Sequence, residues 1–256
     1  MNSNKTFRIK KKYGQHFLNN ENIAKEIIEH LDFKNYQQIF EIGPGLGVLS
    51  KYLIKDCDPI LIEIDKEAVN LLKQTMPEIK KIILGDFLKI DLNKFLKKRN
   101  AVIGNFPYNI STQILFKILE HKDQVQTIIG MFQKEVAERI CSKPNNKKYG
   151  ITSVLMQAYY NCNIIINVSK ENFDPQPNVE SSVIELRRNS TKKLNCDKKE
   201  FVNIVKMSFN QRRKKIKNSL KNLLFNSIES TKYLMEKRPE ELKVNDFVLL
   251  TNNIIR

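Results

Sequence analysis

The sequence predicts an α/β protein: a Rossmann-like, doubly wound sheet of seven mainly parallel strands, followed by a small all-helical domain. Three observations predict this fold. Short apolar runs alternate with helical patterns between residues 39 and 186, which is the order of a parallel sheet with helical crossovers. A glycine-rich turn, GPGLG at residues 43–47, follows the first run. Beyond Asn189 the strand pattern ends, and apolar residues recur at helical spacing.

Each element follows from its own local pattern. The first helix is expected at residues 20–31, where apolar residues repeat at helical spacing. Helical patterns also follow the second strand, at 68–72, and the fifth, at 135–140. Pro175 and Pro177 favour an extended connection before the last strand. The expected strands are residues 39–42, 59–65, 81–87, 101–105, 127–132, 162–168 and 182–186.

Positive charge concentrates at the two ends of the chain. Residues 1–12 hold five Lys or Arg and no acid, and residues 189–256 hold 16 against 7 Asp or Glu. Residues 13–188 between them are nearly balanced, with 23 against 21. A near-neutral body with two basic ends predicts a polyanionic partner, most often nucleic acid. Residues 1–12 are expected to form a mobile basic arm. The alternative, lysines solvated everywhere on the surface, does not explain the neutral body.

Cysteine, histidine and apolar patterns exclude several classes of protein. The four cysteines are scattered singly, and the three histidines have no metal-ligand spacing to them. Disulfides and a metal site are therefore not expected. The N-terminus lacks the apolar segment of a signal peptide, and no apolar run approaches membrane-spanning length. We expect a cytoplasmic protein without membrane contact, by default a monomer.

Polar or glycine residues follow four successive strands, at Gly43, Glu63, Asp86 and Asn105. Ligands of such sheets bind beyond the carboxyl ends of the strands, and an acid at the tip of the second strand is typical of ribose binding. Glycines let the backbone approach a ligand, and the following helix start offers free N–H groups. A dinucleotide fingerprint needs G-x-G-x-x-G, but its last position here is Val48. The G-x-G-x-G pattern instead resembles motif I of class I S-adenosylmethionine (SAM) methyltransferases.

The segment NFPY at residues 105–108 carries the most specific chemistry. It resembles the motif of methyltransferases that modify an exocyclic amino nitrogen. The N6 lone pair of adenine is conjugated with the ring, so acceptors for its two hydrogens make it a better nucleophile. The amide oxygen of Asn105 and a nearby carbonyl are such acceptors. Pro107 fixes the backbone, and Tyr108 can stack on an unstacked base. Catalysis then rests on positioning and electrostatics. The alternative is a proline turn with a half-buried tyrosine.

Taken together, these motifs resemble the 16S ribosomal RNA adenine dimethyltransferases, the KsgA family. The resemblance runs from Tyr13 to about Leu220. It implies a SAM-dependent class I methyltransferase that dimethylates N6 of two adjacent adenosines in a hairpin loop near the 3′ end of small-subunit rRNA, on the pre-30S particle during ribosome assembly. The segments that carry it are GQHFL (14–18), EIGPGLG (41–47), EID (63–65), GDFL (85–88), NFPYNIST (105–112), QKEVAERI (133–140), YG (149–150), FDPQPNVESSV (173–183) and FNQRRKKIKNSL (209–220).

The resemblance also implies roles for single residues. Phe173 is expected as a second stacking surface, or else as a core aromatic under the proline loop. Phe106 stands where the family commonly has Leu, which enlarges one pocket wall. The residues implied for the cofactor are His16, Leu18, Gly43, Gly45, Glu63, Asp86 and Asn105. Those implied for catalysis are Asn105, Pro107 and Tyr108. Those implied for the RNA backbone, unless they form a solvated helix face, are Arg212, Arg213, Lys214 and Lys215.

Other functions remain open at this point. Antibiotic-resistance methyltransferases of large-subunit rRNA carry similar motifs, although the segment at 209–220 favours the small-subunit enzymes. A non-catalytic ribosome-assembly or transcription factor could keep the fold, but the intact Asn105 and Glu63 argue against it. A DNA adenine methyltransferase is disfavoured because no sequence-reading domain is evident. We expect a basic arm at 1–12, a methyltransferase domain at 13–188 and a helical domain at 189–256.

Overall fold

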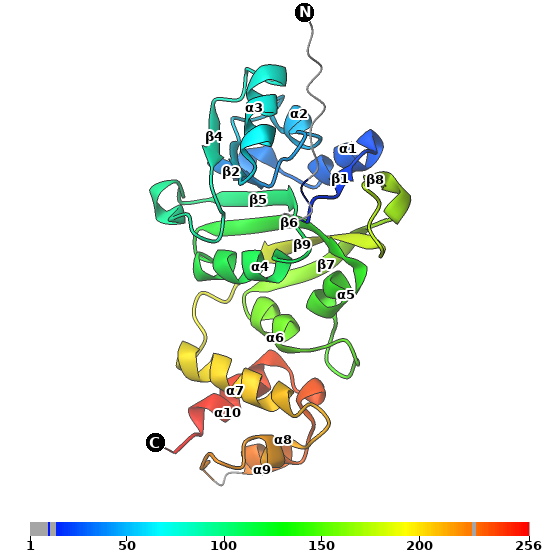
Figure 1. Ribbon diagram of the computed structural model, residues 1–256. Helices are drawn as coiled ribbons and strands as arrows, with labels where there is room; N and C mark the ends of the chain where they lie inside the picture. The colour runs from blue at the N-terminus through cyan, green and yellow to red at the C-terminus, as the bar shows by residue number, and fades with distance from the viewer. Residues whose placement is uncertain (1–9, 11–13, 227–228, 256) are drawn as a thin grey trace, which may run out of the picture. The chain divides into compact units, whose positions relative to one another are not determined.

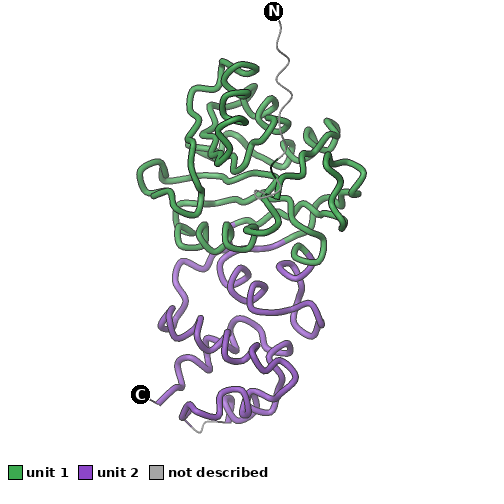
Figure 2. The backbone as a smooth tube through the Cα atoms, viewed as in Figure 1, with its two compact units in different colours: residues 1–137, 163–187 green, residues 138–162, 188–256 purple. Residues whose placement is uncertain are grey.

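The computed structural model describes Lys10, residues 14–226 and residues 229–255. Apart from Lys10, the expected basic arm lies outside the described residues. The chain divides into two compact units, one of residues 1–137 and 163–187, the other of residues 138–162 and 188–256 (Figure 2). The sequence predicts a methyltransferase domain at 13–188 and a helical domain at 189–256, and one boundary between the two units falls between residues 187 and 188. The segment 138–162, however, groups with the C-terminal helices, because its helix α6 packs against α7 and α10.

The seven expected strands form one sheet in the order β4-β3-β2-β5-β6-β9-β7 (Figure 1). Strands β2 to β6 pair in parallel, and β9 is antiparallel to β6. The predicted fold class is therefore confirmed. The strands of this sheet are β2 (Gln38–Ile42), β3 (Ile60–Glu63), β4 (Lys81–Leu84), β5 (Asn100–Asn105), β6 (Val125–Gln133), β7 (Tyr160–Val168) and β9 (Ser181–Arg188).

Capping side chains begin two of the helices that connect these strands. Asn20 accepts hydrogen bonds from the first turn of α1, and Asp65 accepts one from the N–H of Glu67 in α3. Helix α1 buries Ala24, Ile27 and Ile28, as its helical spacing predicts. The helices up to the second unit are α1 (Glu21–Glu29), α2 (Ser50–Leu53), α3 (Lys66–Thr75), α4 (Ser111–Glu120) and α5 (Lys134–Cys141).

The second unit is helical, and its aromatic core includes Phe209, whose ring meets that of Tyr149 edge-on and lies tilted against that of Phe247. The helical pattern of the sequence breaks at residues 211–214 because the chain turns there between α7 and α8. Its helices are α6 (Ile151–Gln157), α7 (Lys198–Asn210), α8 (Ile216–Ser219), α9 (Glu229–Met235) and α10 (Val244–Asn252). Short 3-10 turns lie at Phe33–Asn35, Leu92–Lys94, Lys170–Asn172 and Pro239–Glu241. No helix in the described ranges is long and apolar enough to cross a bilayer.

Two features of the first unit position a site. The chain runs outward from β2 through β3 to β4, then returns to β5 on the other side of β2. Because the strand order reverses there, the carboxyl ends of β2 and β5 form a topological switch point, where sheets of this kind bind ligands. In addition, β1 (Phe17–Leu18) pairs antiparallel with β8 (Phe173–Asp174). This pairing brings the N-terminal segment alongside the proline-containing loop.

Candidate active site

A cavity opens at the switch point, and the space within it and its solvent-filled mouth is about 700 Å³. Eight residues predicted for the cofactor or for catalysis line it: His16, Gly43, Gly45, Glu63, Asp86, Asn105, Pro107 and Tyr108. Leu18 lines a smaller cavity that shares Phe17, Gly43 and Asn105 with the large one. The structure thus brings together side chains from four strand ends and from the N-terminal segment.

The glycine turn is shaped by its contact with that segment. Gly43 and Gly45 have φ of 67° and 56°, in the left-handed region that favours glycine. A Cβ on Gly45 would also lie 2.6 Å from Cε1 of Phe17. Glycine at this position is therefore needed both for the turn and for the aromatic ring that closes on it.

Glu63, at the tip of β3, is held by backbone groups on both sides. The N–H of Gly45 donates to its Oε2 at 3.0 Å, and the N–H of Asp65 donates to its Oε1 at 2.9 Å. Burial raises the pKa of this carboxyl above its usual range, although the two hydrogen bonds oppose the shift. Each carboxylate oxygen can accept a second hydrogen bond. The group is therefore preorganised to accept from ligand hydroxyls.

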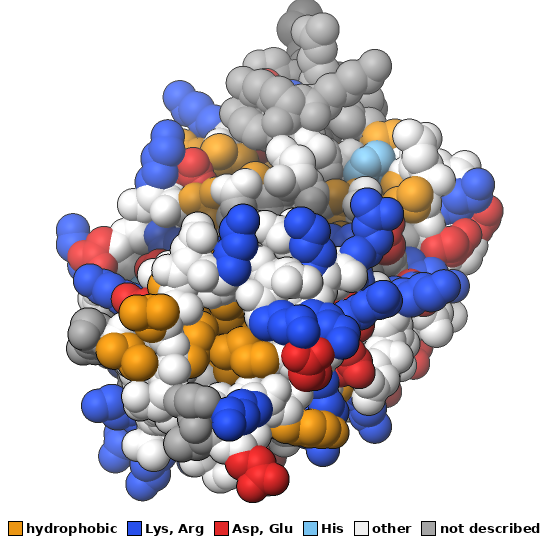
Figure 3. All heavy atoms as spheres, turned by 90° about the horizontal axis from the view of Figure 1, so that it is seen from below, with side chains coloured by type: hydrophobic (Ala, Val, Ile, Leu, Met, Phe, Trp, Pro, Cys, Tyr) orange, Lys and Arg blue, Asp and Glu red, His pale blue; other side chains and the backbone are white. Residues whose placement is uncertain are grey.

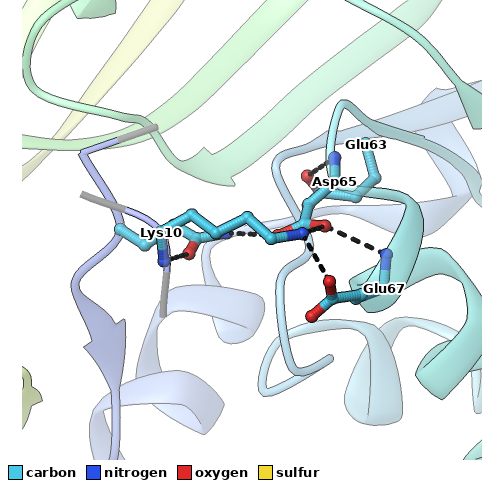
Figure 4. A network of polar contacts seen from close by, with 5 residues as sticks. Lys10, Glu63, Asp65 and Glu67 are labelled. Atoms are coloured by element: carbon cyan, nitrogen blue, oxygen red, sulfur yellow. Dashed lines mark hydrogen bonds and ion pairs between the residues drawn. The ribbon is translucent and has the colours of Figure 1, made fainter. Parts of the chain in front are cut away.

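A polar network ties Lys10 to the same strand end (Figure 4). Asp65 is fully buried. Nζ of Lys10 lies 2.5 Å from its Oδ1 and 3.0 Å from Oε1 of Glu67. Gln15 donates to Asp65 at 3.2 Å and accepts from the N–H of Lys10 at 2.8 Å. We call Lys10, Gln15 and Asp65 the arm clasp. It anchors the segment at residues 14–17, which forms one wall of the cavity.

The arm clasp also sets the charge of Asp65. Burial by itself would raise the pKa of this carboxyl, but hydrogen bonds from Lys10, the N–H of Glu67 and Gln15 bring it below its ordinary value. Asp65 is therefore an ionised, fully enclosed carboxylate. The clasp was not predicted from the sequence, although Lys10, Gln15 and Asp65 lie in the basic N-terminal segment, the GQHFL segment and the EID segment. The sequence carries no signal for this contact, because Lys10 and Asp65 are 55 residues apart in the chain and come together only in the fold.

The side-chain amide of Asn105 has a defined orientation. Its Nδ2 donates to the main-chain carbonyl of His16 at 2.7 Å. A carbonyl can only accept, so this contact assigns the amide nitrogen to His16 and leaves Oδ1 as an acceptor. An acceptor at this position is what the NFPY motif requires for an amino group.

Tyr108 is held at both its hydroxyl and its ring. Its hydroxyl shares a hydrogen bond with Oγ of Ser181, with 2.5 Å between the oxygens. Its ring stacks on the imidazole of His16, with centroids 5.4 Å apart and planes inclined by 24°. Burial raises the pKa of Tyr108, so the phenol stays neutral. Ser181 was missed as a site residue, although it lies in the segment 173–183 that carries the family resemblance.

The enlarged side chain at residue 106 is accommodated by two glycines. Phe106 is 1% exposed and packs edge-on against Phe132 at 5.3 Å. Gly104 and Gly130 are paired across β5 and β6. A Cβ on Gly130 would lie 2.5 Å from the Phe106 ring, and one on Gly104 would lie 2.9 Å from it. The ring therefore occupies space that these glycines leave free, without displacing the neighbouring Asn105.

Phe173 does not lie where a stacking surface would be. It is 3% exposed, belongs to the hydrophobic core of the first unit and is not among the residues lining the cavity. Its partner across the β1–β8 pair is Leu18. This placement fits the alternative interpretation, a core aromatic beneath the proline loop. A base could reach this ring only after the loop rearranged.

The basic run of the second unit lies in the α7–α8 turn rather than on a helix face. Lys215 and Lys217 both pair with Glu236, at 2.8 and 2.7 Å. Arg212 donates to a main-chain carbonyl at 3.3 Å. The side chains of Arg213 and Lys214 are exposed and form no hydrogen bond or ion pair with other described residues. Figure 3 shows many Lys and Arg side chains on one face of the molecule. Of the four residues predicted to contact RNA, Arg213 and Lys214 are thus the two whose positive charges are not already paired within the described residues.

Another buried carboxyl group, that of Glu41, lines the smaller cavity. It is 1% exposed, and Oγ of Ser50 donates to its Oε2 at 2.6 Å. Burial raises the pKa of Glu41 to about 8, so the group is neutral near pH 7.

Among the described residues, no cluster of His, Cys, Asp and Glu side chains could hold a metal ion.

Comparison with known proteins gives consistent similarities. A family model described as "Ribosomal RNA adenine dimethylase" matches residues 6–255. A protein of Cytophaga hutchinsonii named "Ribosomal RNA small subunit methyltransferase A" is 47% identical over 249 residues, or 96% of each chain. The protein of the same name from Flavobacterium johnsoniae is 48% identical over 250 residues, again 96% of each chain.

Two solved structures share the fold. A dimethyladenosine transferase from Plasmodium falciparum has a TM-score of 0.80 at 23% identity, covering 94% of this chain and 100% of that one. The 23S rRNA methyltransferase ErmE has a TM-score of 0.72 at 20% identity, covering 93% and 100%. At these identities the likeness concerns the fold and not the substrate.

Proposed function

Because this chain belongs to the ribosomal RNA adenine dimethylase family, we propose that it uses SAM to dimethylate N6 of two adjacent adenosines in the 3′-terminal hairpin loop of small-subunit rRNA. The observation that carries the proposal is the orientation of Asn105. Its amide nitrogen is satisfied by His16, which leaves its oxygen for the amino group of a base. The names of the bacterial relatives support the small subunit as the source of that base.

The cavity fits the cofactor of the family. Glu63 has two fixed carboxylate oxygens for ribose hydroxyls, and Asp86 lines the same cavity for the adenine amino group. Gly43 lets the backbone approach the methionine part, since it has no Cβ and its φ of 67° favours glycine. When bound, SAM supplies an electrophilic methyl group on a sulfonium. The product is S-adenosylhomocysteine.

The part of the cavity that receives the adenine to be methylated is formed by the NFPY segment. Oδ1 of Asn105 accepts one N6 hydrogen, and the backbone held by Pro107 presents a carbonyl to the other. The nitrogen lone pair is then directed out of conjugation and toward the methyl group. These acceptors stabilise positive charge that develops on N6 during transfer, so the rate gain is electrostatic and positional. Tyr108, neutral and fixed by Ser181, supplies the stacking surface.

The alternatives are weaker on specific grounds. The large-subunit enzyme ErmE shares the fold, but at 20% identity it says nothing about this substrate. A non-catalytic assembly factor has no need of an oriented amide beside a cofactor-sized cavity. We further propose that the protein acts as a monomer, in the cytoplasm, on pre-30S particles. Arg213 and Lys214 are the residues we propose for rRNA backbone contacts.

The test is methyl transfer from labelled SAM to small-subunit particles and, separately, to large-subunit rRNA, both from cells that lack the two modifications. The modified nucleotides are then mapped. Two dimethyladenosines near the 3′ end of small-subunit rRNA are expected. A single modified adenine in large-subunit rRNA would identify a resistance-type enzyme instead. SAM binding without transfer to either RNA would favour the non-catalytic factor.

A further inference from the structure

The imidazole of His16 occupies one face of the Tyr108 ring. The two rings are stacked, with centroids 5.4 Å apart, and both line the large cavity. Nδ1 of His16 lies 2.7 Å from the carbonyl oxygen of Pro175. Because a carbonyl only accepts, Nδ1 carries the proton in this contact. The ring is therefore held by a stack on one side and by a single hydrogen bond at its edge.

No base fits between the two rings as they stand. A base sandwiched between rings needs about 3.5 Å on each side, or about 7 Å between the ring planes. A centroid separation of 5.4 Å is instead that of a pair in direct contact. An adenine that stacks on this face of Tyr108 must take the place of the imidazole.

The contacts of His16 divide between its backbone and its side chain. The main-chain carbonyl accepts the hydrogen bond that orients Asn105. The imidazole makes the stack on Tyr108 and the contact with Pro175. Rotation of the side chain about χ1 would therefore free the Tyr108 face and leave the orientation of Asn105 unchanged. Tyr108 itself stays fixed through its hydroxyl bond to Ser181.

We propose that the His16 side chain is a placeholder for the target base: it covers the stacking face of Tyr108 in the RNA-free protein and swings away when adenine enters. The inference rests on the proposed function, since it assumes that a base enters this cavity. It assigns the His16 side chain a positioning role on the RNA side, besides the cofactor role that the family resemblance implies for this residue. A placeholder reduces the fraction of binding-competent protein, and so weakens apparent RNA affinity by that fraction.

The first test compares His16→Ala with His16→Phe in steady-state methylation of unmodified small-subunit particles. His16→Ala removes the placeholder but keeps the main-chain carbonyl for Asn105. We expect its KM for the particle to fall by about two- to tenfold, the strength of one aromatic stack. His16→Phe keeps a ring against Tyr108, and its KM is expected to stay above that of the Ala variant. His121→Ala, a histidine outside the cavity, is the matched control and should leave KM unchanged.

An unchanged or raised KM for His16→Ala would overturn the placeholder, because the ring would then contribute nothing to base entry or would help to hold the base. SAM affinity is measured separately for each variant, so that a cofactor effect is not mistaken for an RNA effect. Wild-type transfer to the same particles runs in parallel. If the wild type transfers no methyl group, the proposed function fails; if it transfers but KM does not fall, only this inference fails.

A second test needs no stable variant. Wild-type protein with ¹³C-labelled histidine is titrated with a hairpin RNA that carries two adjacent adenosines in its loop, and the three imidazoles are followed by NMR. The ring current of Tyr108 acts on His16 in the stacked state. We expect the His16 signal alone to shift on binding, with His30 and His121 unchanged. An unshifted His16 signal in saturated, methylation-competent complex would show that the rings stay stacked and would overturn the inference.

Discussion

The side-chain amide of Asn105 donates a hydrogen bond of 2.7 Å to the main-chain carbonyl of His16, a residue 89 positions earlier in the chain. The contact joins the end of β5 to the N-terminal segment that forms the opposite wall of the cavity. Through this hydrogen bond, the carbonyl of His16 binds the amide nitrogen of Asn105 and leaves the amide oxygen free to accept from the target base. The catalytic motif is thus oriented by a segment far from it in sequence.

Asn105→Ala should abolish most methyl transfer while preserving RNA binding. The variant loses the acceptor for one N6 hydrogen but keeps the backbone carbonyl and the proline turn. We expect kcat to fall by about 100- to 1,000-fold, the usual cost of removing one preorganised hydrogen-bonding group. Single-turnover transfer and RNA binding by filter retention give the two quantities. An equal loss of both would argue against a catalytic role for the amide.

Glu63→Ala should weaken SAM binding without changing RNA affinity. The carboxylate is already fixed by two backbone N–H groups, so its hydrogen bonds to ribose hydroxyls are preorganised. Charge-assisted bonds of this kind contribute about 1.5 to 3 kcal/mol, which corresponds to a loss of about 10- to 100-fold in affinity. Calorimetric titration with SAM measures it. Glu78→Ala, an exposed carboxylate in the same unit, is the control, and unchanged SAM affinity in Glu63→Ala would contradict the assignment.

The arm clasp should contribute to cofactor affinity at low salt. Lys10→Met removes the cation from the fully buried Asp65, and the carboxylate then takes up a proton or releases the arm. In Asp65→Asn the helix cap is retained, because Asn caps as well as Asp, but the ion pair is lost. We expect both variants to bind SAM more weakly than the wild type, by similar factors.

The matched control for the clasp is Lys80→Met, which breaks an exposed pair with Asp58 of a kind that contributes little. Its SAM affinity should equal that of the wild type. If Lys10→Met binds SAM as tightly as this control, then the clasp does not hold the cavity wall.

Buried Glu41 should make the protein less stable as pH rises. The pKa of its carboxyl is about 8 in the folded state, against an ordinary value of 4.5. Between these values the folded protein holds a proton that the unfolded chain has released, so the free energy of unfolding falls as pH increases and levels off above about pH 8. Glu41→Gln removes this proton linkage and keeps an acceptor for Ser50.

Urea unfolding across this pH range measures the effect. The variant should gain stability relative to the wild type from about pH 4.5 to about pH 8, reaching on the order of a few kcal/mol. A difference between the two proteins that is independent of pH would mean that Glu41 titrates normally in the folded state.

The sequence predicted the sheet and the cavity residues at the strand tips because strand tips in a parallel sheet necessarily meet at one edge. Gly43, Glu63, Asp86 and Asn105 needed only the strand pattern to be placed together. Contacts between distant segments could not be predicted in this way. The Lys10–Asp65 pair joins residues 55 positions apart in the chain, and the Tyr108–Ser181 bond depends on the position of β9. Phe173 shows the same limit, since a loop aromatic can face either the cavity or the core.

Removing positive charge from the α7–α8 turn should weaken the salt dependence of RNA binding. Arg213→Gln with Lys214→Gln removes two exposed charges that have no partner among the described residues. If both contact phosphates, the slope of log affinity against log salt concentration should become shallower by about 1.4, given about 0.7 for each contact with single-stranded RNA. Lys215→Gln with Lys217→Gln is the matched pair, because Glu236 already neutralises part of its charge. We expect a smaller change in slope there. Equal slopes in all three proteins would show that the turn faces solvent and that rRNA is contacted elsewhere.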